Sequence, residues 1–160
     1  MNLWHDIPTG NINAVIEVKK GTKRKYELDK KTGRFILDRL SIVAFPINYG
    51  FIPRTLAKDK DPLDIMVYDH KIKKASIVET RPIALLQMKD SGIQDDKILA
   101  VPKSYNIKFK DLPKPLLKDI EYFLRIYKGK KTKVFKWLPL KKAKEEIKKA
   151  KERYKKCFTN

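Results

Sequence analysis

The hydrophobic pattern of the chain changes its period along its length, and this change limits the folds that the sequence can adopt. In the first part, short segments alternate apolar and polar residues, as Ala14, Ile16 and Val18 do with Glu17, which is typical of strands. Turn-forming stretches such as "DKKTG" separate these segments. Strands are predicted at residues 13–19, 25–28, 34–40, 63–68, 76–80, 82–88, 97–101 and 132–137.

The last third of the chain has mainly a helical period. One apolar stripe predicts a helix that begins after Pro115 and ends at Gly129, with the members Leu116, Ile120, Phe123, Leu124 and Tyr127. A second, lysine-coated helix carries the thinner stripe Ala143, Ile147, Ala150 and Tyr154. Many short strands with turn-rich joins indicate a closed or partly closed antiparallel barrel. With two helices added, the expected fold is an OB-like α+β domain.

Length and cysteine content indicate the number of domains and the cellular compartment of the protein. A chain of 160 residues can bury a core, and we expect one domain over residues 1–160. No apolar run approaches the roughly 18 residues of a membrane span, and the first residues lack the features of a signal peptide. Cys157 is the only cysteine, so no internal disulfide can form. We therefore expect a cytoplasmic protein without a membrane partner.

The net charge of +19 is the least ordinary property of the composition. Lys and Arg total 38 against 19 acidic residues, and most of the excess is lysine. One interpretation is a surface for nucleic acid or another polyanion. The other is a solvated lysine coat, which we favour because phosphate and base recognition uses arginine forks and exposed aromatic rings.

An acidic motif interrupts this basic chain. Asp59, Asp61 and Asp64 form the pattern D-x-D-x-x-D, and Pro62 fixes the backbone between the second and third acids. Asp64 alternates with apolar neighbours at the start of a predicted strand, so we expect it to point away from the core. Carboxylates this close repel one another unless cations join them. Oxygen ligands without His or Cys suit Mg²⁺ or Mn²⁺, although a surface turn remains the alternative.

A second acidic group strengthens the metal interpretation. Asp90, Asp95 and Asp96 surround a glycine turn between two predicted strands, and Glu17 and Glu27 could reach the same end of the barrel. Basic and hydroxyl side chains are also available, namely Lys25, Arg39, Lys97, Lys128, Tyr49 and Tyr127. Acids that hold Mg²⁺ beside bases that hold anions are what phosphoryl transfer to water needs.

These motifs together resemble those of the soluble family I inorganic pyrophosphatases. The most specific match is "DKDPLDI", and "VIEV", "KYELDKKTG", "LDR", "NYGFIPRTL", "DDKILAVP" and "YK" follow the family's order. The resemblance implies Mg²⁺-dependent hydrolysis of inorganic diphosphate, with Mn²⁺ or other divalent cations as substitutes. It also implies a five-stranded OB-like barrel with helices packed outside, and a homohexamer.

The resemblance also assigns roles to residues. Asp59, Asp64 and Asp95 would bind the activating Mg²⁺, and Asp64 would bridge to a second one. The water between the two metals would be the nucleophile, with Asp61 as its general base. Asp90, Asp95 and Glu27 would hold metal that arrives with the substrate, and Glu17 would support the site. The phosphates would be bound by Lys25, Arg39, Tyr49, Lys97, Tyr127 and Lys128.

Three features depart from the family pattern. Lys60 stands where a small or acidic residue is usual, Phe45 replaces a common tyrosine, and the connector at residues 40–45 is short. They leave open a homologue with impaired activity. The other alternative is an OB-like binder of nucleic acid or another polyanion, which would have no use for the acid cluster.

Overall fold

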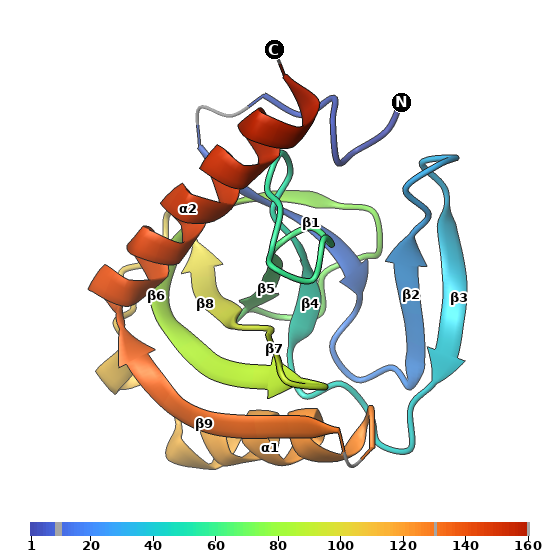
Figure 1. Cartoon of the computed structure of the whole chain (residues 1–160). Helices are drawn as coiled ribbons and strands as arrows, with labels where there is room; N and C mark the ends of the chain where they lie inside the picture. The colour runs from blue at the N-terminus through green and yellow to red at the C-terminus, as the bar shows by residue number, and fades with distance from the viewer. Residues whose placement is uncertain (9–10, 130, 160) are drawn as a thin grey trace.

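Five strands form a closed ring in the computed structural model, which describes residues 1–8, 11–129 and 131–159 (Figure 1). β1 (Ile12–Val18) pairs with both β4 (Asn48–Phe51) and β6 (Ile77–Asp90). β5 (Asp64–Val67) joins β4 to β8 (Lys97–Pro102), which pairs with β6. The predicted OB-like barrel is confirmed. Its sheet is mixed rather than wholly antiparallel as predicted, because the connection through β6 brings the chain back parallel to β5 at β8.

The remaining strands lie outside this ring. β2 (Arg24–Leu28) and β3 (Phe35–Leu40) form a separate two-stranded hairpin, which stands beside the barrel on the right of Figure 1. β7 (Ile93–Gln94) and β9 (Thr132–Pro139) both pair with β6. The β2–β3 hairpin is therefore a separate sheet that lies next to the barrel and is not part of it.

The period-2 pattern does not predict β4, because all four of its residues are buried and one is a glycine. Gly50 pairs with Ile16 on one side and Ile65 on the other. A Cβ at Gly50 would lie 1.8 Å from the carbonyl oxygen of Val15. Only glycine therefore allows β1 and β4 to approach this closely, and this contact holds together the part of the ring from which Tyr49 projects.

The two strands predicted at residues 76–80 and 82–88 are one long strand, β6. Pro82 interrupts the sequence pattern but pairs with Ala100, and the register shifts between Pro82 and Ala84. A proline fits at such an irregularity because its missing N–H removes no regular ladder bond.

Both predicted helices are present, as α1 (Lys114–Ile126) and α2 (Leu140–Phe158). Proline is accepted in the first turn of α1, and Gly129 has a φ of +86° just beyond its end. All four members of the thinner stripe on α2 are buried, together with Glu146. No helix of the described residues is long and apolar enough to cross a membrane.

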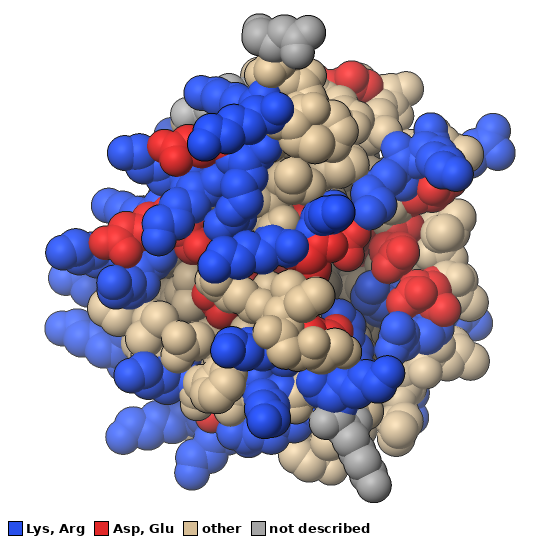
Figure 2. All heavy atoms as spheres, in the orientation of Figure 1, with Lys and Arg blue, Asp and Glu red and all other residues tan. Residues whose placement is uncertain are grey.

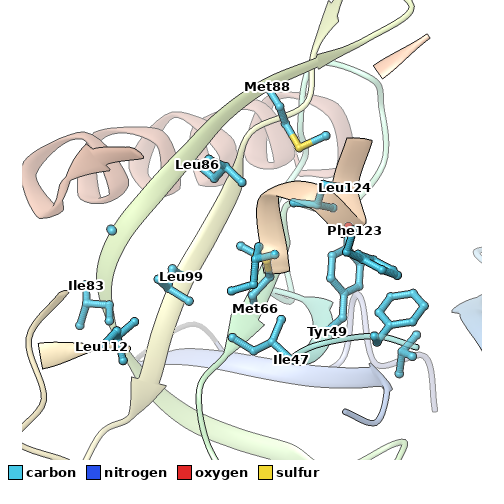
Figure 3. Close-up of a cluster of buried hydrophobic side chains, with 14 of the residues drawn as sticks. Ile47, Tyr49, Met66, Ile83, Leu86, Met88, Leu99, Leu112, Phe123 and Leu124 are labelled. Carbon is cyan, nitrogen blue, oxygen red and sulfur yellow. The ribbon is translucent and has the colours of Figure 1, made fainter. Parts of the chain in front are cut away.

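The helices close the core from two sides. Phe123 and Leu124 of α1 pack into a cluster with Met66, Leu86 and Leu99 of the barrel (Figure 3). On the other side, Ala143, Ile147 and Ala150 of α2 pack into a second cluster, whose barrel members are Ala14, Ile16, Ile52, Leu63, Ile65, Val67, Leu85, Ile98 and Ala100. Tyr154 packs into a third cluster, with Trp4 and Phe51. A buried residue of this size, such as Ile147, contributes roughly 1.5–3 kcal/mol. The barrel is therefore a rigid support for the loops at its mouth.

Candidate active site

A cleft of about 240 Å³ lies between the β2–β3 hairpin and the loop that joins β4 to β5. Its polar lining consists of Glu17, Lys25, Glu27, Lys30, Asp38, Arg39, Tyr49, Asp59, Asp61, Asp64, Tyr127 and Lys128. Figure 2 shows acidic side chains gathered between the hairpin and the barrel, with lysines and arginines around them. The cleft thus combines acids with bases, as the sequence predicts.

The β4–β5 loop, residues 52–63, carries two of the acids to the cleft. Thr55 is fully buried and closes the base of the loop, since its hydroxyl donates to Ile52 O and accepts from Leu63 N at 3.0 Å. At the tip, the N–H of Asp61 donates to Asp59 Oδ1 at 3.0 Å. Asp64 opens β5 between buried neighbours and lines the cleft, which confirms that it points away from the core.

The opposite wall is the hairpin, where cations and acids are paired. Lys25 Nζ lies 3.0 Å from Glu27 Oε2 and 3.5 Å from Asp38 Oδ2. Arg39 Nε lies 3.0 Å from the same oxygen of Asp38. Each cation of this wall is therefore held in place while its charge faces the cleft.

Below the cleft, the buried ammonium of Lys97 joins two of the predicted metal ligands. Its Nζ lies 2.5 Å from Asp64 Oδ2 and 2.7 Å from Asp95 Oδ1. Burial alone would raise the pKa of Asp64, but the charge and hydrogen bond of Lys97, together with the charges of Lys128 and Lys25, outweigh it and lower that pKa. For Asp95, burial dominates over Lys97 and raises the pKa. Asp64 is thus held ionised.

Burial and repulsion among the acids both act on Asp59. Burial, and then the charges of Asp64, Asp95 and Asp61, raise the pKa of Asp59 to about 6, against the lowering effect of its bond from the Asp61 N–H. The sequence predicts this outcome for carboxylates gathered without cations. A cation placed among these acids would therefore be bound favourably.

Glu17 is a buried acid of the cleft whose pKa is raised. Glu17 alternates with apolar residues in the sequence, yet its side chain is buried too, and its Oε2 accepts a hydrogen bond from Leu28 N at 2.8 Å. Burial raises its pKa to about 8, more than the Leu28 hydrogen bond lowers it, and the charge of Asp64 adds to the increase.

This shift predicts a pH dependence of stability. The folded protein keeps a proton on Glu17 that the unfolded chain releases, so the free energy of unfolding falls as pH rises from about 4.5 to 8. Glu17→Gln keeps the acceptor for Leu28 N but cannot ionise. We expect the variant to be more stable than the native chain at the upper end of that range by a few kcal/mol, with equal stability below it.

Urea unfolding in EDTA across this pH range measures the effect. Glu152→Gln, which changes an exposed glutamate of α2, serves as the matched control and should leave the slope unaltered. Parallel pH profiles for the native chain and Glu17→Gln would show that burial of Glu17 does not govern its protonation.

The structure brings the residues predicted for the site into one region. Most of them line the cleft, namely Glu17, Lys25, Glu27, Arg39, Tyr49, Asp59, Asp61, Asp64, Tyr127 and Lys128. Asp90, Asp95 and Lys97 are linked to it by ion pairs, since Lys128 Nζ lies 3.4 Å from Asp90 Oδ2 and 3.8 Å from Asp95 Oδ2. The roles assigned to them remain predictions.

Sequence reasoning missed two polar residues of the cleft. Asp38 bridges Lys25 and Arg39, and Lys30 Nζ lies 2.7 Å from Asp61 Oδ1. Both belong to stretches already singled out, "LDR" and "KYELDKKTG". The signal that could have found Asp38 is its position beside Arg39 on a strand paired with that of Lys25.

The departures from the family pattern do not disturb the cleft. Lys60 has a φ of +68°, the conformation in which glycine is the usual residue, and its exposed side chain lines a different hollow, with Leu56 and Lys156. Phe45 is buried against Phe123 and Tyr127. Arg39 lines the cleft in spite of the short connector.

No three His, Cys, Asp or Glu side chains of the described residues lie close enough together to form a ready metal centre. The acids that would have to converge are held by Lys97 and Lys128 instead. One buried carboxylate oxygen among the described residues, Asp95 Oδ2, nevertheless accepts no hydrogen bond. Such an atom is a free acceptor for a cation.

Comparisons with known proteins agree on one family. Residues 14–155 match the sequence model described as inorganic pyrophosphatase. The chain is 41% identical to the inorganic pyrophosphatase of Aquifex pyrophilus, over 96% of this chain and 97% of the relative. It is 37% identical to that of Haloferax volcanii, over 99% of both. The crystal structure of inorganic pyrophosphatase from Thermus thermophilus superposes with a TM-score of 0.89 at 34% identity, covering 97% of this chain and 99% of that one.

Proposed function

The chain belongs to the inorganic pyrophosphatase family, and we propose that its acidic cleft performs the family's hydrolysis of diphosphate with the help of Mg²⁺. The reaction itself, the conversion of diphosphate to two phosphates, follows from family membership. The observation that carries the assignment to this cleft is the presence of Glu17, Glu27, Asp38, Asp59, Asp61 and Asp64 opposite Lys25, Arg39 and Lys128.

The side chains fit Mg²⁺. The donor set is made of carboxylate oxygens, which Mg²⁺ and Mn²⁺ prefer. The free oxygen of Asp95 and the raised pKa of Asp59 both indicate that a cation would be stabilised there. Asp59, Asp64 and Asp95 would hold the activating ion, and Asp90 and Glu27 would hold further metal. When bound, Mg²⁺ would neutralise phosphate charge and lower the pKa of a coordinated water.

The chain's own residues complete the proposal. Asp61, the most exposed acid of the D-K-D-P-L-D motif, takes the proton of the attacking water as the P–O–P bond breaks. Lys25, Arg39 and Lys128 offset the charge that develops on the leaving phosphate. Tyr49 and Tyr127 would donate hydroxyl hydrogen bonds to phosphate oxygens. The predicted phosphate role of Lys97 stays a prediction, since its ammonium donates to Asp64 and Asp95.

Phosphate release from diphosphate tests the proposal. We expect release that requires Mg²⁺, is partly supported by Mn²⁺ and stops in EDTA. A purified, folded protein that releases no phosphate with either ion would refute the activity at this cleft and would leave the impaired homologue as the better interpretation.

Binding of nucleic acid is not favoured by the cleft. Its acids would repel a phosphodiester backbone, and many of the lysines lie along the outer side of α2 in Figure 2, away from the cleft. Retention of nucleic acid only at low salt would indicate charge attraction alone.

We also propose that the protein is a cytoplasmic homohexamer. Leu40 and Ile42, at and beyond the end of β3, are 69% and 76% exposed in the single chain, which supports burial by another copy. The free thiol of Cys157 supports a reducing compartment. Sedimentation measures the oligomeric state, and cell fractionation measures the compartment.

A further inference from the structure

The loop that carries Asp59 and Asp61 is bound to the C-terminal helix through both backbone polar groups of one residue, Leu56. The N–H of Leu56 donates to the carbonyl of Ala150 on α2 at 3.0 Å. The carbonyl of Leu56 accepts from Nη1 of Arg153, one turn further along the same helix, at 2.7 Å. Both polar groups of this loop residue are therefore bound by α2, although Arg153 and Leu56 are 97 positions apart in the sequence.

Arg153 is itself held in place. Its Nη2 lies 2.9 Å from Oε1 of Glu146, which is buried on the same helix face as Arg153. The side chains of Arg153 and Glu146 are only 25% and 10% exposed, so the pair is shielded from water. A guanidinium can donate to the carboxylate and the carbonyl at once in a fixed fork, which a lysine ammonium on a flexible stem does less well.

The position of Leu56 fixes the acids that follow it. The next residue, Ala57, donates its N–H to Asp61 O at 2.8 Å, and Lys60 donates to Ala57 O at 3.0 Å. These bonds close a tight turn that contains Asp59 and Asp61. A shift of the Leu56 peptide would therefore move both carboxylates relative to the hairpin wall.

We propose that Arg153, oriented by Glu146, is a positioning residue that sets the acid-bearing turn through the Leu56 carbonyl. The inference rests on the roles proposed above for Asp59 and Asp61. Arg153 lies on the far side of the loop from the cleft, where it lines a separate hollow with Leu56 and Cys157. It acts on the reaction through main-chain geometry, and a displacement of about 1 Å in a reacting group can lower a rate by 10²-fold.

Kinetics of Arg153→Ala, Arg153→Lys and Glu146→Gln test the proposal. For Arg153→Ala we expect kcat to fall at least tenfold and the Mg²⁺ concentration for half-activation to rise. KM for diphosphate should change less than twofold, because Lys25, Arg39 and Lys128 belong to other elements. Arg153→Lys should restore part of kcat. Lys148→Ala removes an exposed charge from a different face of α2 and should match the native chain.

A measurement that does not depend on activity accompanies the kinetics. Amide hydrogen exchange of residues 56–61 should quicken in Arg153→Ala and remain native in Lys148→Ala, at a temperature where melting curves show both to be folded. Native exchange and native kcat in folded Arg153→Ala would overturn the inference, and so would a change confined to KM. Absence of phosphate release by the native chain would instead refute the proposed function, and the exchange data would still decide whether Arg153 holds the turn.

Discussion

Asp61→Asn should lower kcat for diphosphate hydrolysis by roughly 10²–10⁴-fold, the usual contribution of a general base. The amide cannot accept the proton of the attacking water, yet it matches the carboxylate in size. The side chain of Asp61 is 56% exposed and its ion pair is with the partly exposed Lys30, so the substitution removes little stability. A phosphate-release assay at saturating Mg²⁺, together with thermal melting, measures both effects.

The matched control is Asp119→Asn, which removes the charge of an exposed aspartate on α1, outside the cleft. Its kcat should equal that of the native chain. A near-native kcat in Asp61→Asn would refute its role as the general base and would assign that role to another acid of the cleft.

The helices and most strands could be predicted because their patterns are local. The stripe of Ala143, Ile147, Ala150 and Tyr154 is buried as its spacing indicates. The β4 strand could not be predicted in this way, because it is buried on both faces and depends on the contact of Gly50 with Val15. Burial on both faces removes the alternation on which strand prediction relies.

Most of the polar residues that line the cleft could be predicted from the motifs, but the pairings among them could not. Lys97 contacts Asp64 because the parallel register sets Ile98 beside Ile65, which brings the preceding residues together. No local sequence pattern predicts a contact between two residues that are 33 positions apart. The contact of Arg153 with Leu56 is missed for the same reason, since it depends on how α2 docks on the barrel.

We expect Lys97→Met to cause a large loss of stability, because the register of β5 and β8 pairs Lys97 with Asp64 in the interior. Methionine keeps the length of the side chain but leaves the carboxylates of Asp64 and Asp95 without their common cation. Lys97 is fully buried, and breaking a buried ion pair by removing one partner costs roughly 3–5 kcal/mol. We expect that loss in EDTA. Mg²⁺ should restore more stability to the variant than to the native chain, because a cation would then join the two acids.

Thermal and urea unfolding, each carried out with EDTA and with Mg²⁺, measure the loss of stability and its recovery. Lys103→Met is the control, because Lys103 forms an exposed ion pair with Glu79 at 3.0 Å, and its removal should cost less than about 1 kcal/mol. Equal losses in the two variants would show that the Lys97 pairs contribute no more than a surface pair. A large loss in Lys97→Met that Mg²⁺ does not reduce would separate the two acids from the metal site. Recovery with Mg²⁺ would show that Asp64 and Asp95 accept either a lysine or a metal as their shared cation.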